Sequence, residues 1–196
     1  MPRGSDNETL ILDAARGLFL EHGYAETSMD AVARAAGVSK ATVYALFRSK
    51  DQLFVAVVVH QGRDQTLFLS TVDGVGVNDA LRAFGRQAAN LLLSDEVVAI
   101  YRMVAAEARR APEIGPLFWA SGPQHLIGEL AVFLQNAMHS GHLRSAPAHV
   151  AAGQFLAIIV GDLQLRRFVG TASSSDAERR ALIESGIDAF LRAYAP

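Results

Sequence analysis

The sequence predicts an all-α protein, and three observations support that fold class. The chain of 196 residues is 51% hydrophobic and rich in alanine, the residue with the highest helix propensity. Apolar residues recur at the helical period of 3.6 along most of the chain, and strand-like alternation is scarce. Short polar residues and glycines stand where helices would begin and end. We expect about ten helices and no strand.

Composition excludes several classes of protein. The chain has no cysteine, which excludes disulfides and thiolate chemistry and suits a reducing compartment. Its polar start, MPRGSDNE, lacks the apolar core of a signal peptide. The longest apolar runs, such as residues 53–59, fall short of the ~20 residues that a membrane span needs. We therefore expect a cytoplasmic protein with no membrane partner.

A loose arm is expected at residues 1–6, followed by a first helix at about residues 7–22. Gly23 is expected to end this helix in the left-handed conformation. The inward face of the helix shows the spacing i, i+3, i+4, i+7, i+8, and it consists of Ile11, Ala14, Ala15, Leu18 and Phe19.

Two short helices joined by a tight turn at Gly37 are expected next. Thr27 or Ser28 caps the first helix, and Ser39 caps the second, because a short polar side chain can accept a hydrogen bond from the first helical turn. The buried positions of this pair are expected to be Met29, Val32, Ala33, Ala36, Val38, Val43, Leu46 and Phe47. This is a helix-turn-helix, whose second helix can enter the major groove of DNA.

The same segment concentrates positive charge. Between Asp30 and Asp51 there is no acidic residue, and the basic residues there are Arg34, Lys40, Arg48 and Lys50. The chain as a whole has a net charge of -2 and contains no other lysine. A local basic patch of this kind indicates a surface that contacts phosphates.

The residues expected to contact DNA are Thr27, Ser39, Lys40, Ala41, Thr42, Tyr44 and Lys50. Lys40 and Thr42 can reach phosphates or base edges, and Ala41 can lie against a thymine methyl group. Tyr44 and Lys50 can bond to phosphates, which position the protein without reading sequence. Alternatively, Tyr44 and Phe47 are core aromatics and Lys50 is an exposed cap residue.

A capping box, Ser49-x-x-Gln52, predicts a fourth helix from Lys50 to about Thr71. After a glycine-rich break at residues 73–77, a fifth helix is expected to carry Leu81 to Leu92. Further helices are expected at residues 95–109, 111–123, 124–140, 147–169 and 175–194. The predicted domains are residues 1–50, which would bind DNA, and residues 51–196, which would bind a ligand and dimerise.

Residues 7–55 resemble the tetracycline-repressor (TetR) family of one-component bacterial regulators. The matching residues are Ala14, Leu18, Phe19, Gly23, Thr27, Ala33, Ala36, Gly37, Val38, Ser39, Thr42, Tyr44, Phe47, Lys50, Leu53 and Phe54. Ala41 departs from the glycine of many members, and Ala45-Leu46 from a frequent aromatic. The resemblance implies an all-helical homodimer with a small DNA-binding domain and a larger effector domain.

The second part of the chain resembles the AefR-like subset of that family. The resemblance rests on Glu107 to Glu113, Phe118, Gly122-Pro123 and Gly161 to Leu163, and it implies an apolar cavity between the fourth and eighth helices. The expected ligand contacts are Gln61, Met103, Glu107, Phe118, Trp119 and His125. For each of these residues, ordinary core packing is the alternative.

The helix at residues 147–169 is apolar nearly all round, so one side is expected to meet something beyond its own domain. With the last helix it would form a four-helix dimer interface. The expected interface residues are Phe155, Ile159, Leu163, Ile183, Ile187 and Phe190.

Catalytic motifs are missing from the sequence, and so is any cofactor motif. His139 and His142 would not share a helix face, because Gly141 lies between them, so no metal site is expected. The sequence therefore predicts a transcriptional regulator, most simply a repressor, that binds a palindromic operator as a homodimer and is released by a small apolar or amphipathic effector. The alternative is a helical binding protein or enzyme that does not bind DNA.

Overall fold

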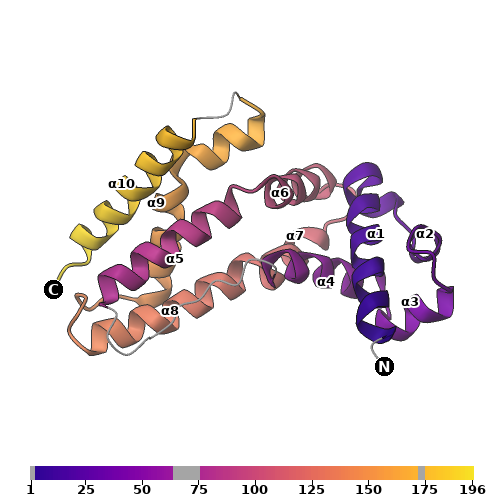
Figure 1. Ribbon diagram of the computed structural model, residues 1–196, viewed down its shortest axis with the longest axis horizontal. Coiled ribbons are helices and arrows are strands. Elements are labelled where there is room, and N and C mark those ends of the chain that lie inside the picture. Colours follow the sequence, from indigo (N-terminus) through magenta and orange to yellow (C-terminus); the bar gives the residue numbers. More distant parts are fainter. Residues whose placement is uncertain (1–2, 64–75, 172–174) are drawn as a thin grey trace. The chain divides into compact units, whose positions relative to one another are not determined.

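The computed structural model describes residues 3–63, 76–171 and 175–196. These residues form ten helices and no strand, which confirms the all-α prediction (Figure 1). The helices are α1 (Arg3–Glu26), α2 (Met29–Ala35), α3 (Lys40–Leu46), α4 (Lys50–Arg63), α5 (Val77–Leu92), α6 (Asp95–Glu107), α7 (Ile114–Ser121), α8 (Pro123–His139), α9 (Ala148–Val169) and α10 (Asp176–Ala193).

Contacts divide the chain into two compact units. The first unit comprises residues 1–64 and 99–123, and the second comprises residues 65–98 and 124–196. The first unit therefore contains α1 to α4 together with α7 and most of α6, whereas the sequence placed a domain boundary at residue 50. Residues that are distant in sequence thus complete the core around the helix-turn-helix.

In the first unit, α1 packs against α2 and α4, α3 packs against α2, and α7 packs against α4 (Figure 1). Three aromatic rings stand at the centre of this core. The ring centroids of Phe19 and Tyr24 are 5.7 Å apart, and Phe54 meets both rings edge-on at 5.6 and 5.5 Å. All three side chains are at most 2% exposed. This cluster ties the end of α1 to α4.

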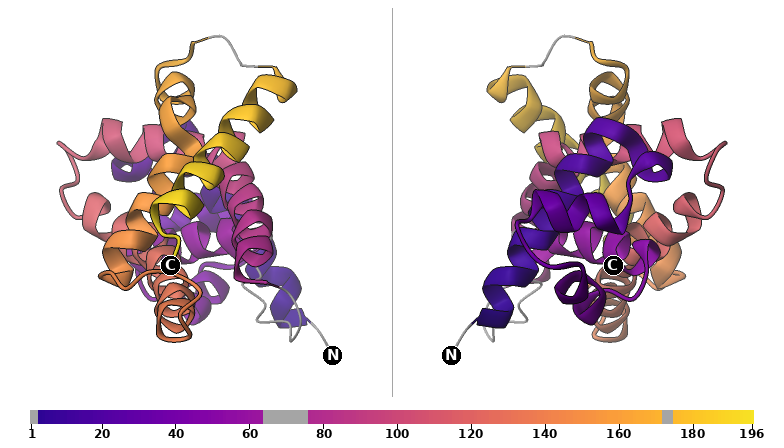
Figure 2. Two further views of the ribbon diagram at one scale, coloured as in Figure 1. Left: turned by 90° about the vertical axis from the view of Figure 1, so that its left-hand side faces the viewer. Right: turned by 90° about the vertical axis from the view of Figure 1, so that its right-hand side faces the viewer.

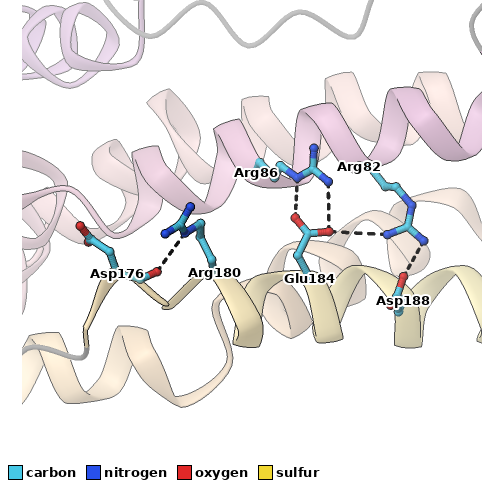
Figure 3. Close-up of polar contacts among 6 residues, drawn as sticks. All are labelled: Arg82, Arg86, Asp176, Arg180, Glu184 and Asp188. Carbon is cyan, nitrogen blue, oxygen red and sulfur yellow. Dashed lines mark hydrogen bonds and ion pairs between the residues drawn. The ribbon is translucent and has the colours of Figure 1, made fainter. Parts of the chain in front are cut away.

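In the second unit, α10 lies against α9 and α5 (Figure 2). Ion pairs join α10 to α5 along their exposed edge (Figure 3). Arg82 contacts Asp188 at 2.5 Å and Glu184 at 3.6 Å, and Arg86 forms a bidentate pair with Glu184. The hydrogen bond from Arg86 lowers the pKa of Glu184 below its ordinary value. These pairs are partly exposed, so they contribute little to the free energy of folding. Their main effect is on the alignment of α10 with α5.

Helix caps were predicted well from local sequence. Ser28, Ser39 and Ser175 each accept a hydrogen bond from the first turn of α2, α3 and α10. At the start of α4, Ser49 accepts from the amide of Gln52 at 3.2 Å, and the Gln52 side chain accepts from the amide of Arg48 at 3.0 Å. The bond to Ser49 is the expected half of the capping box, whereas Gln52 reaches the amide of the residue before the cap instead of that of Ser49.

Two expected boundaries differ from the structure. The first helix begins at Arg3, so part of the expected arm is helical. Asp6 lies in the first turn of α1, where an acidic side chain favours the positive end of the helix. The expected end at Gly23 is a bend with non-helical angles, and α1 continues to Glu26. Described residues of α4 end at Arg63, and the expected extension to Thr71 lies outside the described residues.

The helix α9 has 22 residues and a mean hydropathy of 1.4 in its most apolar window, which meets the length and composition of a membrane span. The core helix of a soluble protein passes the same test. Gly161 interrupts α9 with non-helical angles (φ 49°, ψ -135°), and residues such as Phe155 and Ile159 are buried in the core of the second unit. Packing within this unit thus accounts for much of its apolar composition.

Close approach of α9 and α10 requires a glycine at position 186. A Cβ atom there would lie 2.5 Å from the carbonyl oxygen of Ile158 and 3.1 Å from the Cα of Ile159. Because these are backbone atoms, the helices would have to separate. We expect Gly186→Ala to lower the free energy of unfolding by about 2 kcal/mol, the cost of overpacking.

The matched control is Gly128→Ala in α8, where a Cβ atom meets nothing within 4 Å. Helix propensity alone should then raise stability by about 0.5–1 kcal/mol. Urea unfolding of both variants measures the difference, and equal stabilities would contradict the close packing of α9 on α10.

Candidate nucleic-acid interface

A short turn orients α3 relative to α2. Gly37 has a φ of 67°, which glycine adopts without strain. The amide of Gly37 donates to the carbonyl of Arg34 at 3.2 Å, and the amide of Val38 donates to that of Ala33 at 3.1 Å. On the other side of the turn, the Ser39 hydroxyl accepts from the amide of Thr42 at 3.1 Å. Both ends of the turn are therefore fixed by local hydrogen bonds, as the sequence predicted.

One face of α3 is buried and the other is open. Val43 is fully buried and Phe47, just after the helix, is 6% exposed. Lys40, Ala41 and Ala45 are exposed, Thr42 is half-buried, and the Tyr44 side chain is 48% exposed. The structure thus places the predicted contact residues of α3 on an accessible surface, and Tyr44 is not a core aromatic.

Leu46 was expected to be buried, but it is 41% exposed. The helix is only seven residues long, and Val43 and Phe47 already fill its positions in the core of the first unit. Spacing alone could not show which of three neighbouring apolar residues would point outward.

Both lysines bond to other parts of the same unit. Lys40 forms an ion pair with Asp30 of α2. The ammonium of Lys50 donates to the carbonyl oxygens of Tyr24 at 2.8 Å and Ala25 at 3.1 Å. It also lies 4.4 Å from the centroid of the Tyr24 ring, a cation–π distance. Lys50 therefore holds the end of α1 at the start of α4, a role that the sequence did not indicate.

The Tyr24 side chain adds a further contact between the end of α1 and the start of α4. Its hydroxyl donates to the carboxylate of Asp51. Burial first, and then Asp51, raise the pKa of Tyr24 well above its ordinary value. The phenol therefore keeps its proton and remains a hydrogen-bond donor. Its bond to Asp51 connects the end of α1 to the first turn of α4.

The structure places Thr27 inside the protein, whereas the sequence expected it to reach DNA. Thr27 is 3% exposed. Its hydroxyl donates to the carbonyl of Gly23 at 2.8 Å and to that of Leu18 at 3.2 Å. The cap of α2 is Ser28. With its hydroxyl engaged in this way, the Thr27 side chain shapes the turn rather than the surface.

Two basic residues of the segment remain on the surface. Arg34 and Arg48 are exposed, and within the described part of the chain neither side chain has an ion-pair partner. They are the cations of the helix-turn-helix that folding leaves available. Both arginines contribute to the local positive charge that is visible in the sequence, but neither was among the predicted DNA contacts.

The residues expected to bind a ligand are not all gathered around one site. Met103, Glu107 and Phe118 are each 8% exposed in the first unit, and Trp119 is 53% exposed. His125 belongs to the second unit, where it is exposed and lies 3.2 Å from Glu129. The side chain of Gln61 lies outside the described residues.

A groove of about 420 Å³ lies in the first unit. It is lined mainly by apolar residues of α1, α4 and the end of α3, such as Leu12, Leu46 and Val55, and Glu8 and Asp51 add carboxylates. None of the expected ligand contacts lines this groove.

The residues expected at a dimer interface lie in the core of a single subunit. Phe155, Ile159, Leu163, Ile183, Ile187 and Phe190 are each at most 4% exposed in the second unit. Other apolar residues of the same helices face outward, and they are Val150, Ile158, Leu165, Val169 and Leu182, from 39% to 66% exposed. An all-round apolar helix indicates burial, but its pattern does not reveal which side faces the partner.

Family models match both parts of the chain. Residues 11–57 match the bacterial regulatory proteins of the tetR family, and residues 79–196 match the C-terminal domain of AefR-like transcriptional repressors. This chain belongs to the TetR family. Both resemblances found in the sequence are thereby confirmed.

Individual relatives agree with this assignment. An uncharacterised HTH-type transcriptional regulator of Mycobacterium tuberculosis is 30% identical over 145 residues, which is 72% of this chain and 68% of the relative. The uncharacterised regulator YhgD of Bacillus subtilis is 47% identical over 49 residues, but this match spans only 26% of its length. The solved structure of the flavonoid-responsive regulator FrrA is 37% identical, covers 98% of both chains and has a TM-score of 0.80.

The protein is therefore a TetR-family transcriptional regulator with a DNA-binding helix-turn-helix. Proteins of this family are DNA-binding regulators and not enzymes. The alternative of an enzyme or binding protein with purely structural amino-terminal helices does not agree with this membership.

Lys50 should affect stability as well as DNA binding. Removing its ammonium leaves two carbonyl oxygens without their donor, so we expect Lys50→Ala to lower the free energy of unfolding by about 1 kcal/mol. Arg48→Ala, which removes an exposed cation two positions away, should change it by less than about 0.5 kcal/mol. Denaturant unfolding at neutral pH measures both, and equal effects would show that Lys50 is a surface residue only.

Proposed function

We propose that this protein is a repressor that binds a palindromic operator as a homodimer and is released by a small apolar or amphipathic effector. The observation that carries the DNA part of the proposal is the open face of α3, presented by a capped turn in a segment with excess positive charge. Because DNA lies in the cytoplasm of bacteria, we also place the protein there.

The proposed contacts to DNA follow from exposure. Ala41 and Tyr44 are open on α3, so that the alanine methyl can lie against thymine and the phenol can donate to a phosphate. Ser39 and Thr42 share a hydrogen bond of 2.8 Å at the start of α3, where free amides favour phosphate. Lys40 would exchange Asp30 for a phosphate, which costs little because this ion pair is exposed.

Lys50 is proposed to contact a phosphate with the part of its ammonium that the carbonyls of residues 24 and 25 leave free. An ammonium has three N–H donors, and two acceptors are assigned in the structure. Thr27 is proposed to affect DNA binding only through the shape of the turn, since its buried hydroxyl donates to backbone carbonyls there.

The proposed dimer surface consists of the outward apolar residues of α9 and α10. Leu165 and Val169 lie one helical turn apart, and they are 62% and 66% exposed. Exposed apolar residues that gather on neighbouring helices are typical of a protein–protein interface. A twofold dimer would present two copies of α3 to successive major grooves, ~34–36 Å apart.

The proposed effector is a small molecule with a largely apolar body. Support comes from FrrA, whose name describes a flavonoid-responsive regulator and which aligns with almost the whole of this chain. Met103, Phe118 and Trp119, which all belong to the first unit, remain proposed ligand contacts. The effector can release DNA only through a difference in its affinity for the two states of the protein.

The test is a titration of the protein into labelled duplex DNA from the upstream region of its own gene. Fluorescence anisotropy measures the binding at several salt concentrations. We expect tight binding relative to an unrelated duplex. Lys40→Gln should lower the salt dependence by about one unit per half-site, because one phosphate contact is lost. Arg109→Gln, which removes an exposed cation outside the helix-turn-helix, is the matched control.

Light scattering at micromolar concentration tests assembly. We expect a dimer for the natural protein and a monomer with weaker operator binding for Leu165→Glu. A natural protein that is monomeric, or that binds operator and unrelated DNA equally, would contradict the proposal.

A panel of flavonoids and other aromatic amphiphiles tests the effector. Binding should quench or enhance the fluorescence of Trp119, the single tryptophan, and release the operator over the same concentration range. Molecules that bind tightly yet leave operator affinity unchanged would remove ligand release from the proposal.

A further inference from the structure

The segment from Gly23 to Thr27, here called the α1–α2 turn, consists of the last part of α1 beyond its bend and the residue that follows it. It receives side chains from two other helices. From α4, Lys50 donates to the carbonyls of Tyr24 and Ala25, and Asp51 accepts from the Tyr24 hydroxyl. From α6, the carboxylate of Glu107 accepts a hydrogen bond from the amide of Ala25 at 3.1 Å. All these residues belong to the same compact unit. The turn therefore joins α6 to the helices that carry the DNA-binding surface.

Burial makes the contact of Glu107 unusual. In the described part of the chain, the buried polar or charged residues are Thr27 and Glu107, and both bond to this turn. A carboxylate that is 8% exposed loses most of its hydration, and it is tolerated only where hydrogen bonds replace the water. The Arg110 guanidinium is 3.9 Å away and 76% exposed, so it contributes little. The amide of Ala25 is the close donor.

Gly23 shows that the turn is shaped around this carboxylate. Its angles, φ 80° and ψ 169°, fall in a region that is essentially restricted to glycine. A Cβ atom at this position would lie 2.9 Å from Cδ of Glu107 and 3.0 Å from Oε1. Absence of a side chain at Gly23 thus permits both the backbone path and the approach of Glu107.

We propose that Glu107 is a positioning residue for DNA binding. Glu107, at the end of α6, holds the α1–α2 turn in place. The carbonyl oxygens of that segment then position the ammonium of Lys50 beside the protein surface that binds DNA. The inference rests on the proposed operator contact of Lys50. It gives Glu107 a role different from the ligand contact that the sequence suggested, and it makes operator affinity sensitive to any displacement of this end of α6.

The test compares operator affinity for two substitutions at this position. Glu107→Ala removes the acceptor, and we expect about a tenfold loss of affinity, which corresponds to about 1.4 kcal/mol. Glu107→Gln retains an oxygen that can accept from Ala25, and its affinity should stay within about threefold of the natural protein. The slope of affinity against salt should stay unchanged in Glu107→Gln, and in Glu107→Ala it should fall by at most about one unit per half-site, the share of the single Lys50 contact.

Glu96→Ala is the matched control, since it removes an exposed carboxylate from the other end of the same helix. Its operator affinity should equal that of the natural protein. Circular dichroism and urea unfolding establish that each variant is folded at the assay temperature. If Glu107→Ala does not fold, Glu107→Asp keeps the charge with a shorter reach, and its affinity should fall below that of the Gln variant.

Three outcomes would overturn the inference: full operator affinity in folded Glu107→Ala, equal losses in the Gln and Ala variants, or full affinity in Glu107→Asp where the Ala variant does not fold. Failure of the proposed function is recognised separately, because the natural protein would then show no preference for its operator.

Discussion

At Gly23 the helix α1 bends through backbone angles that only glycine adopts at low cost, and the path to the helix-turn-helix depends on that bend. Tyr24 then enters the aromatic core beside Phe19 and Phe54. Thr27 closes the turn through hydrogen bonds to backbone carbonyls. Only after this turn can Ser28 cap α2 and direct α3 outward. The orientation of the helix-turn-helix therefore depends on residues 23–27, which precede α2.

Positive charge in this region serves two purposes. Lys50 neutralises carbonyls at the end of α1, where the helix dipole is negative, and Lys40 pairs with Asp30. Arg34 and Arg48 stay exposed. A count of basic residues therefore overstates the charge that is free to meet phosphates, because part of it is already used to assemble the unit. The lysine side chains that we propose to contact DNA also form interactions that build the fold.

Local features could be predicted from the sequence because their partners are near in the chain. The caps at Ser39 and Ser175 reach only three residues ahead. By contrast, Glu107 and Ala25 are 82 residues apart, and no periodicity or motif indicates that pairing. The buried and exposed sides of α9 could not be predicted either. A helix with apolar residues all round does not indicate whether the side of Ile159 or the side of Leu165 packs within its own subunit.

Hydrogen exchange of the Ala25 amide, followed by NMR, directly measures the hydrogen bond from that amide to Glu107. We expect slow exchange in the natural protein, similar exchange in Glu107→Gln, and much faster exchange in Glu107→Ala, while the amide of Val43 in α3 keeps its protection. Exchange at Ala25 that is equally fast in the natural protein and in the folded Glu107→Ala variant would contradict this expectation.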